Sequence, residues 1–73
     1  MGENSLGYLI RHYRTLKPLS RIEFAKEVGV SSTAVWQWET NKRKVRPSHL
    51  RKIAEVLSVD VTEFTKYLVN KEE

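Results

Sequence analysis

The chain has 73 residues, 40% of them hydrophobic, with a formal net charge of +4 and no cysteine. This length has room for one small domain, expected over residues 1–73 with its core at about 5–69, and the lack of cysteine excludes disulfides and thiolate metal sites. Because no apolar run can cross a bilayer and the N-terminus lacks a signal-peptide pattern, we expect a cytoplasmic protein without a membrane partner.

Two helices are predicted before residue 30. Residues 5–16 carry apolar side chains at helical spacing, namely Leu6, Leu9, Ile10, Tyr13 and Leu16. Lys17–Pro18 is expected to close this helix, because the residue before a proline avoids the helical region. Ser20 and Glu23 have the spacing of a capping box, which predicts a second helix over residues 21–28. Gly29 then stands where a left-handed C-cap belongs.

The third helix is expected to begin after the cap Ser31 and to run to about Thr40. Asn41 tolerates a positive φ and is a plausible terminator. Only Gly29–Ser31 separates the second helix from the third, and so short a turn containing glycine predicts a helix-turn-helix.

Two further helices are predicted after a charged loop. Pro47 can open the fourth helix in its first turn. The apolar face of that helix is Leu50, Ile53, Ala54 and Leu57. Asp60 and Glu63 are expected to form a capping box for a fifth helix. The buried stripe of this last helix is expected to be Val61, Phe64 and Leu68. No segment alternates with period two, so the predicted fold is an all-α, compact five-helix domain.

The third helix has one polar and one apolar face. At about 100° per residue, the polar face contains Ser32, Thr33, Trp36 and Gln37. The opposite face contains Ala34, Val35 and Trp38, of which Trp38 is expected in the core. The polar face suits base reading in the major groove, since glutamine pairs with an adenine edge and serine or threonine can serve several bases. Trp36 could lie against a thymine methyl or a sugar, or pack against a neighbouring loop.

The charge pattern agrees with a nucleic-acid partner. Residues 1–30 carry a net charge of +2, residues 31–52 carry +5 and residues 53–73 carry −3. The basic middle predicts one face for a polyanion, with the acidic end pointing elsewhere. The loop cations are Lys42, Arg43, Lys44 and Arg46, and we expect them to neutralise phosphates beside the third helix.

Three stretches carry a more specific pattern. They read LSRIEFAxxVGVS at residues 19–31, VxxWExNKR at residues 35–43 and LxxIAxxLxV at residues 50–59. Together they resemble the phage-repressor-like helix-turn-helix family, of the Cro/repressor (XRE-like) type. The resemblance covers residues 5–69 and implies a lambda-repressor-like DNA-binding domain.

The resemblance also implies roles for individual residues. The positions that match Ser32, Thr33 and Gln37 read bases in that family. The position that matches Arg21 contacts a phosphate, and Ser20 is expected beside it in the same role.

In that family, the positions that match Arg14 and Glu39 form a partly buried salt bridge between the first helix and the end of the third. Asn41 replaces the family's usual glycine, and the loop at residues 42–46 is one residue longer than the common form.

Catalysis and metal binding have little support in the sequence. His12 and His49 are 37 residues apart, and no cysteine or third histidine accompanies them. No nucleophile has an evident base and orienting group, and three scattered glycines cannot make a phosphate loop. We therefore expect no enzyme activity, cofactor, metal or small-molecule ligand.

The expected function is a sequence-specific, DNA-binding transcriptional regulator, in the simplest case a repressor that binds an inverted-repeat operator. The expected partners are double-stranded DNA and a second copy of the chain. The candidate dimer surface is Tyr67, Leu68 and Val69 at the acidic end. Two alternatives remain open: a protein-interaction or antitoxin-type module that never reads DNA, and a non-specific nucleic-acid binder.

Overall fold

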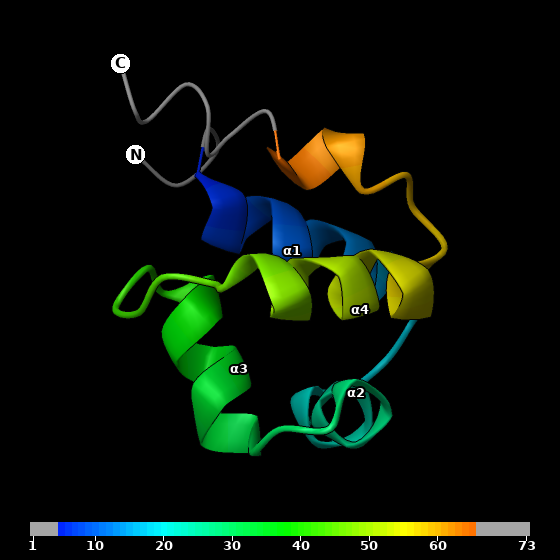
Figure 1. Cartoon of the computed structure of the whole chain (residues 1–73). Helices are drawn as coiled ribbons and strands as arrows, with labels where there is room; N and C mark the ends of the chain where they lie inside the picture. Colours follow the sequence, from blue (N-terminus) through cyan, green and yellow to red (C-terminus); the bar gives the residue numbers. More distant parts are fainter. Residues whose placement is uncertain (1–4, 66–73) are drawn as a thin grey trace.

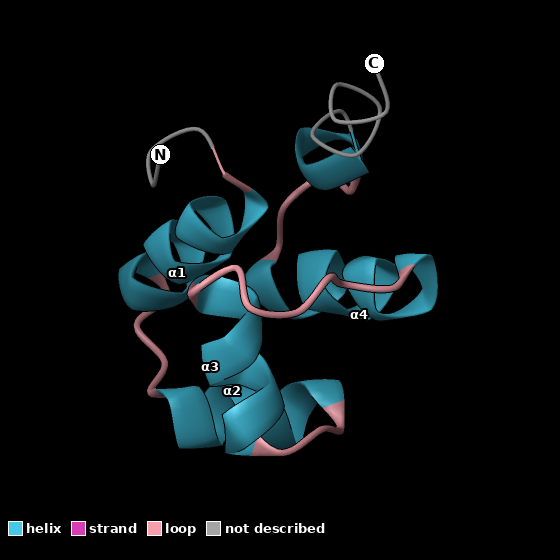
Figure 2. Ribbon diagram, turned by 90° about the vertical axis from the view of Figure 1, so that its left-hand side faces the viewer, coloured by secondary structure: helices cyan, strands magenta, loops and turns pink. Residues whose placement is uncertain are grey.

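The computed structural model describes residues 5–65 of the chain (Figure 1). The four main helices of this part are α1 (Leu6–Leu16), α2 (Arg21–Val28), α3 (Ser32–Glu39) and α4 (Pro47–Leu57). A fifth helical segment occupies residues 62–65. Figure 2 shows only helices and loops in the described part, which confirms the predicted all-α fold. None of these helices is long and apolar enough to span a membrane.

Serine caps define the starts of the first three helices. The hydroxyl oxygens of Ser5, Ser20 and Ser31 each accept the N–H of the residue three positions later, at 3.1 Å in all three cases. The capping box of α2 is confirmed, since the N–H of Ser20 also donates to the Glu23 carboxylate at 2.9 Å. Each cap satisfies a backbone donor that an α-helix leaves unpaired in its first turn.

Three residues with positive φ end helices or turns. Gly29 (φ 91°) caps α2 in the left-handed conformation and Asn41 (φ 62°) follows α3, as the sequence predicts. Ser58 (φ 59°) ends α4 in the same conformation and was not predicted. The turn at Gly29 brings α2 and α3 together as the helix-turn-helix, which lies on one side of α1 and α4 in Figures 1 and 2.

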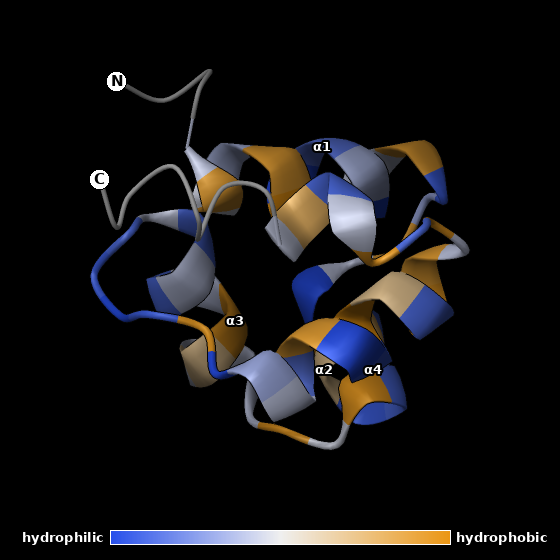
Figure 3. Cartoon of the chain, turned by 45° about the horizontal axis from the view of Figure 1, so that its top comes forward, coloured by the Kyte–Doolittle hydropathy of each residue, from blue (hydrophilic) through white to orange (hydrophobic). Residues whose placement is uncertain are grey.

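The core contains side chains from every described helix. Its six largest fully buried side chains are Ile10, Phe24, Val35, Leu50, Ile53 and Phe64. Trp38 is only 3% exposed, so its predicted place in the core is confirmed. The loop after α3 also contributes the buried side chain of Val45. Most of this loop is hydrophilic (Figure 3). Val45 therefore anchors the charged loop to the domain.

One expectation is corrected by the packing. Leu16, expected on the apolar face of α1, is 67% exposed because it is the last residue of the helix, where the chain turns away toward α2. Asp60 lies at the start of the helical segment at residues 62–65, and its carboxylate accepts the N–H and hydroxyl of Thr62, both at 3.0 Å. The Glu63 N–H donates to the backbone carbonyl of Asp60 at 2.9 Å.

The start of α1 lies directly against the end of α3 at Gly7. A β-carbon at Gly7 would come within 2.4 Å of the Trp38 carbonyl oxygen and 2.8 Å of the Glu39 carbonyl oxygen. The Asn41 side-chain amide also donates to the Ser5 hydroxyl at 3.2 Å. Only glycine permits this approach, which fixes the C-terminal end of α3 against α1.

Candidate nucleic-acid interface

The outer face of α3 carries the side chains predicted to read bases. Ser32 and Thr33 are exposed, and Trp36 is 39% exposed. Gln37 is half-buried and accepts a hydrogen bond from the Arg43 guanidinium at 3.4 Å. These four residues therefore lie together on one accessible surface, with Gln37 the least free of the four.

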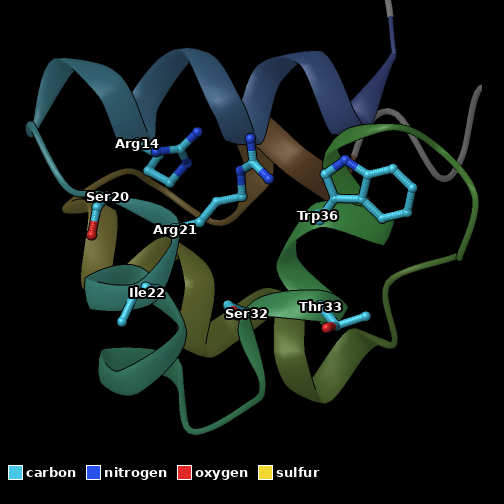
Figure 4. A pocket seen from close by; sticks show the side chains of 7 residues that line it. All are labelled: Arg14, Ser20, Arg21, Ile22, Ser32, Thr33 and Trp36. Carbon is cyan, nitrogen blue, oxygen red and sulfur yellow. The ribbon is translucent and has the colours of Figure 1, made fainter.

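An open cleft of about 600 Å³ runs along one flank of this face (Figure 4). Ser20, Arg21 and Ile22 contribute from the start of α2, and Ser32, Thr33 and Trp36 from α3, with Arg14 of α1 behind them. The start of α2 and the polar face of α3 thus share one concave surface.

A buried carboxylate organises the inner wall of the cleft. The Glu39 side chain is 3% exposed, and it accepts hydrogen bonds from Arg14 Nε at 2.5 Å and Arg14 Nη2 at 3.1 Å. The remaining Arg14 terminal nitrogen, Nη1, donates to the Leu19 carbonyl oxygen at 2.7 Å. Arg14 is therefore held on three sides and links α1, the loop before α2 and the end of α3.

Arg21 shares the same carboxylate more loosely. Its Nε lies 3.7 Å from Glu39 Oε1, and its side chain is 48% exposed. One carboxylate faces two guanidinium groups, so the cluster keeps one uncompensated positive charge, and the accessible part of that charge is on Arg21. Ser20, beside it, uses its N–H and its hydroxyl oxygen in the capping box, which leaves the hydroxyl hydrogen to donate outward.

A second, smaller groove of about 300 Å³ lies against the apolar side of α3, where Ala34 and Trp38 are. Its floor is formed by α3 and its cap, and its outer wall by three loop cations and His49. The lining residues are Val30, Ser31, Ala34, Trp38, Arg43, Lys44, Arg46 and His49. Among the cations of this groove, Arg43 reaches the polar face of α3 through its hydrogen bond to Gln37.

Two of the loop cations lie against the reading face. Arg43 donates to Gln37, and the Lys42 ammonium is 6.0 Å from the centre of the Trp36 ring, at the limit of a cation–π contact. Lys44 and Arg46 are exposed. The loop thus places Lys42 and Arg43 beside the polar face of α3, while Lys44 and Arg46 line the smaller groove.

The two histidines have ring contacts in the fold. His12 stacks on Tyr8 and meets Tyr13 edge to face, with ring centres 6.1 Å and 5.2 Å apart. His49 lies 5.4 Å from the Trp38 ring. Within residues 5–65, no group of three or more histidine, cysteine or acidic side chains could hold a metal ion.

Sequence reasoning missed Ile22, which is 67% exposed on the wall of the larger cleft. The sequence does contain a signal for it. Ile22 is a β-branched apolar residue in the first turn of α2, and it is separate from the buried positions of that helix, which are Phe24, Ala25 and Val28. The expected dimer residues, Tyr67, Leu68 and Val69, lie outside the described residues.

Comparison with known protein families finds a match over the same part of the chain. A family model described as helix-turn-helix matches residues 10–64, which contain α2, α3 and the turn between them. A search of curated proteins finds no significant match.

Proposed function

The chain belongs to the phage-repressor-like helix-turn-helix family of DNA-binding transcriptional regulators, and from this premise we propose that it is a sequence-specific repressor. In this proposal α3 enters the major groove and presents Ser32, Thr33, Trp36 and Gln37 to base edges. Arg21 and the loop cations contact the phosphates of the two strands that border the groove.

One observation carries the proposal: the polar face of α3 lies between two cationic flanks. The major groove is about 12 Å wide and is bordered on both sides by phosphates, so a reading helix needs positive charge on each side. Arg21 supplies it at the larger cleft, and on the loop side it comes from Arg43, bonded to Gln37, and from Lys42, beside Trp36. The uncharged side chains of α3 stand between them, where the bases are.

The proposal includes two copies of the chain on one operator. Four reading residues on one helix give limited specificity, and a dimer on an inverted repeat doubles the number of base pairs that are read. Two recognition helices would then lie about 34 Å apart, one turn of DNA. The proposed contact surface is Tyr67, Leu68 and Val69. These residues belong to the acidic C-terminal end of the sequence, whereas the loop is basic.

Selection of bound sequences from a random DNA pool tests specificity and symmetry together. The expected result is a motif with two inverted halves, and two chains per duplex at saturating protein. Recovery of no motif would contradict sequence-specific binding. An asymmetric motif bound by one chain would retain base reading but reject the dimer.

The salt dependence of binding tests the phosphate contacts. Each neutralised phosphate contributes about 0.9 to the slope of log affinity against log salt concentration. Lys44→Gln is therefore expected to reduce the slope by about that amount on every sequence. The matched control is Lys26→Gln, which removes an exposed lysine from α2 at a position outside both grooves. An unchanged slope for Lys44→Gln would make the loop a solvated charge run.

A further inference from the structure

Ile22 is an exposed apolar side chain whose neighbours in the larger cleft are mostly charged or hydroxyl-bearing. Four large hydrophobic side chains of the described residues are exposed: Tyr8, Leu16, Ile22 and Trp36. Two of them, Ile22 and Trp36, line the same cleft, from α2 and α3 respectively (Figure 4). Ile22 is the more accessible, with 67% of its surface exposed against 39% for Trp36.

Neither the core nor the helix accounts for this residue. The inward face of α2 is formed by Phe24, Ala25 and Val28, which are buried without any contribution from Ile22. Isoleucine is also a weaker helix former than alanine or leucine, because its β-branch restricts the side chain against the preceding turn. Most of the surface of Ile22, 67% of it, therefore stays exposed in the described fold.

The surroundings of Ile22 indicate what could cover it. Arg21 precedes it with a half-exposed guanidinium, and Ser32 and Thr33 lie on the α3 side of the same cleft. A polyanion is the partner that matches this charge. Within the major groove, the 5-methyl group of thymine is the apolar feature that the bases display.

We propose that Ile22 is a specificity-determining residue that contacts the 5-methyl group of a thymine in the operator. The inference rests on the proposed function and adds a reader on α2 to those on α3. It requires the operator to hold a thymine near the edge of each half-site, on the α2 side of the recognition helix.

Methyl deletion in the DNA tests this contact directly. Deoxyuridine replaces each thymidine of the selected duplex in turn, which removes only the methyl group, and affinities are measured for the full chain and for Ile22→Ala. Burial of one methyl-sized group is worth roughly 0.8 kcal/mol, or about a fourfold change in affinity. The parent chain is expected to lose about fourfold at one thymine of each half-site.

The diagnostic result is the loss of that effect in the variant. Ile22→Ala is expected to bind the thymine and uracil duplexes equally well at that position, while Ile22→Val keeps most of the discrimination. Leu16→Ala is the matched control, because Leu16 is also 67% exposed but does not line the cleft. It is expected to show the uracil profile of the parent chain. Thermal unfolding of each variant checks that the exposed substitutions leave the fold intact.

Two results would overturn the inference while the proposed function stands. In the first, the parent chain and Ile22→Ala show the same uracil profile on a well-defined motif. In the second, Ile22→Ala weakens binding equally on all duplexes and lowers cooperativity, which would assign Ile22 to a contact between chains. Absence of any selected motif would instead reject base reading as a whole, including the contact by Ile22.

Discussion

The two ends of α3 differ in how firmly the rest of the domain holds them. At the C-terminal end, Gly7 brings α1 against the backbone, Asn41 bonds to Ser5, and the buried Glu39 carboxylate bonds to Arg14. At the N-terminal end, the cap Ser31 is followed by the exposed Ser32 and Thr33 beside an open cleft. One end of the helix is fixed by tertiary contacts, and the other exposes polar side chains beside the cleft.

This asymmetry has a mechanical consequence for recognition. Base-reading side chains need a rigid support, because a small misplacement weakens each hydrogen bond. Fixing α3 at one end orients the whole helix while Ser32 and Thr33, in its first turn, remain exposed. Substitutions at the two ends should therefore have different effects. Those at the fixed end should lower stability, and those at the accessible end should lower DNA affinity.

The largest expected effect is the loss of stability when the Arg14–Glu39 ion pair at the fixed end of α3 is broken. Glu39→Ala leaves Arg14 buried without its carboxylate, and breaking a buried pair costs about 3–5 kcal/mol in free energy of unfolding. Chemical denaturation of Glu39→Ala, Arg14→Met and the double variant would measure this cost and the coupling between the two residues. A coupling energy indistinguishable from zero would show that the pair does not stabilise this end.

Gly7→Ala is expected to have the next largest effect. In an ordinary helix this substitution raises stability by about 0.5–1 kcal/mol, because alanine loses less conformational entropy. Here the added β-carbon meets backbone carbonyl oxygens of α3, so we expect a loss of about 1–3 kcal/mol from overpacking. Arg11→Ala, at an exposed site of the same helix, is the control and should change stability by less than about 0.5 kcal/mol. A stabilised Gly7→Ala would contradict the close approach.

Gln37→Ala tests the reading surface. A two-bond contact between glutamine and adenine discriminates by about 1–3 kcal/mol, so affinity for the selected site should fall by that amount. Affinity for unrelated DNA and the thermal unfolding midpoint should barely change. Equal losses on both DNAs would assign Gln37 to support of Arg43, its hydrogen-bond partner, and not to base reading.

The smallest expected effect is at Asp60, which lies away from both ends of α3. Hydrogen bonds from the Thr62 N–H and then from its hydroxyl hold the pKa of the Asp60 carboxyl below its ordinary value. Because the folded pKa is the lower one, the contribution to stability is present at neutral pH and is lost as pH falls through the lowered pKa. Thermal unfolding against pH should show a small acid-dependent loss that is absent in Asp60→Asn. An identical pH profile for the two proteins would refute this.

Short-range signals in the sequence were sufficient for much of the fold. The Ser20–Glu23 capping box, the left-handed Gly29 and the proline at the start of α4 each act within a few residues, so their outcome is readable from neighbours alone. Helical spacing likewise separated the buried Trp38 from the exposed face of α3. Spacing was insufficient at Leu16, where the helix ends and the expected apolar position faces solvent.

Describing the candidate interface required both the amino-acid sequence and the tertiary structure. The amino-acid sequence by itself determined which side chains share the polar face of α3 and that a basic loop follows it. Only the tertiary structure decided that Gln37 is partly covered by Arg43, that Glu39 faces two arginines, and that Ile22 lies on the wall of the cleft. The physical reason is range: Arg21 and Glu39 belong to different helices, and such contacts exist only once the helices have packed.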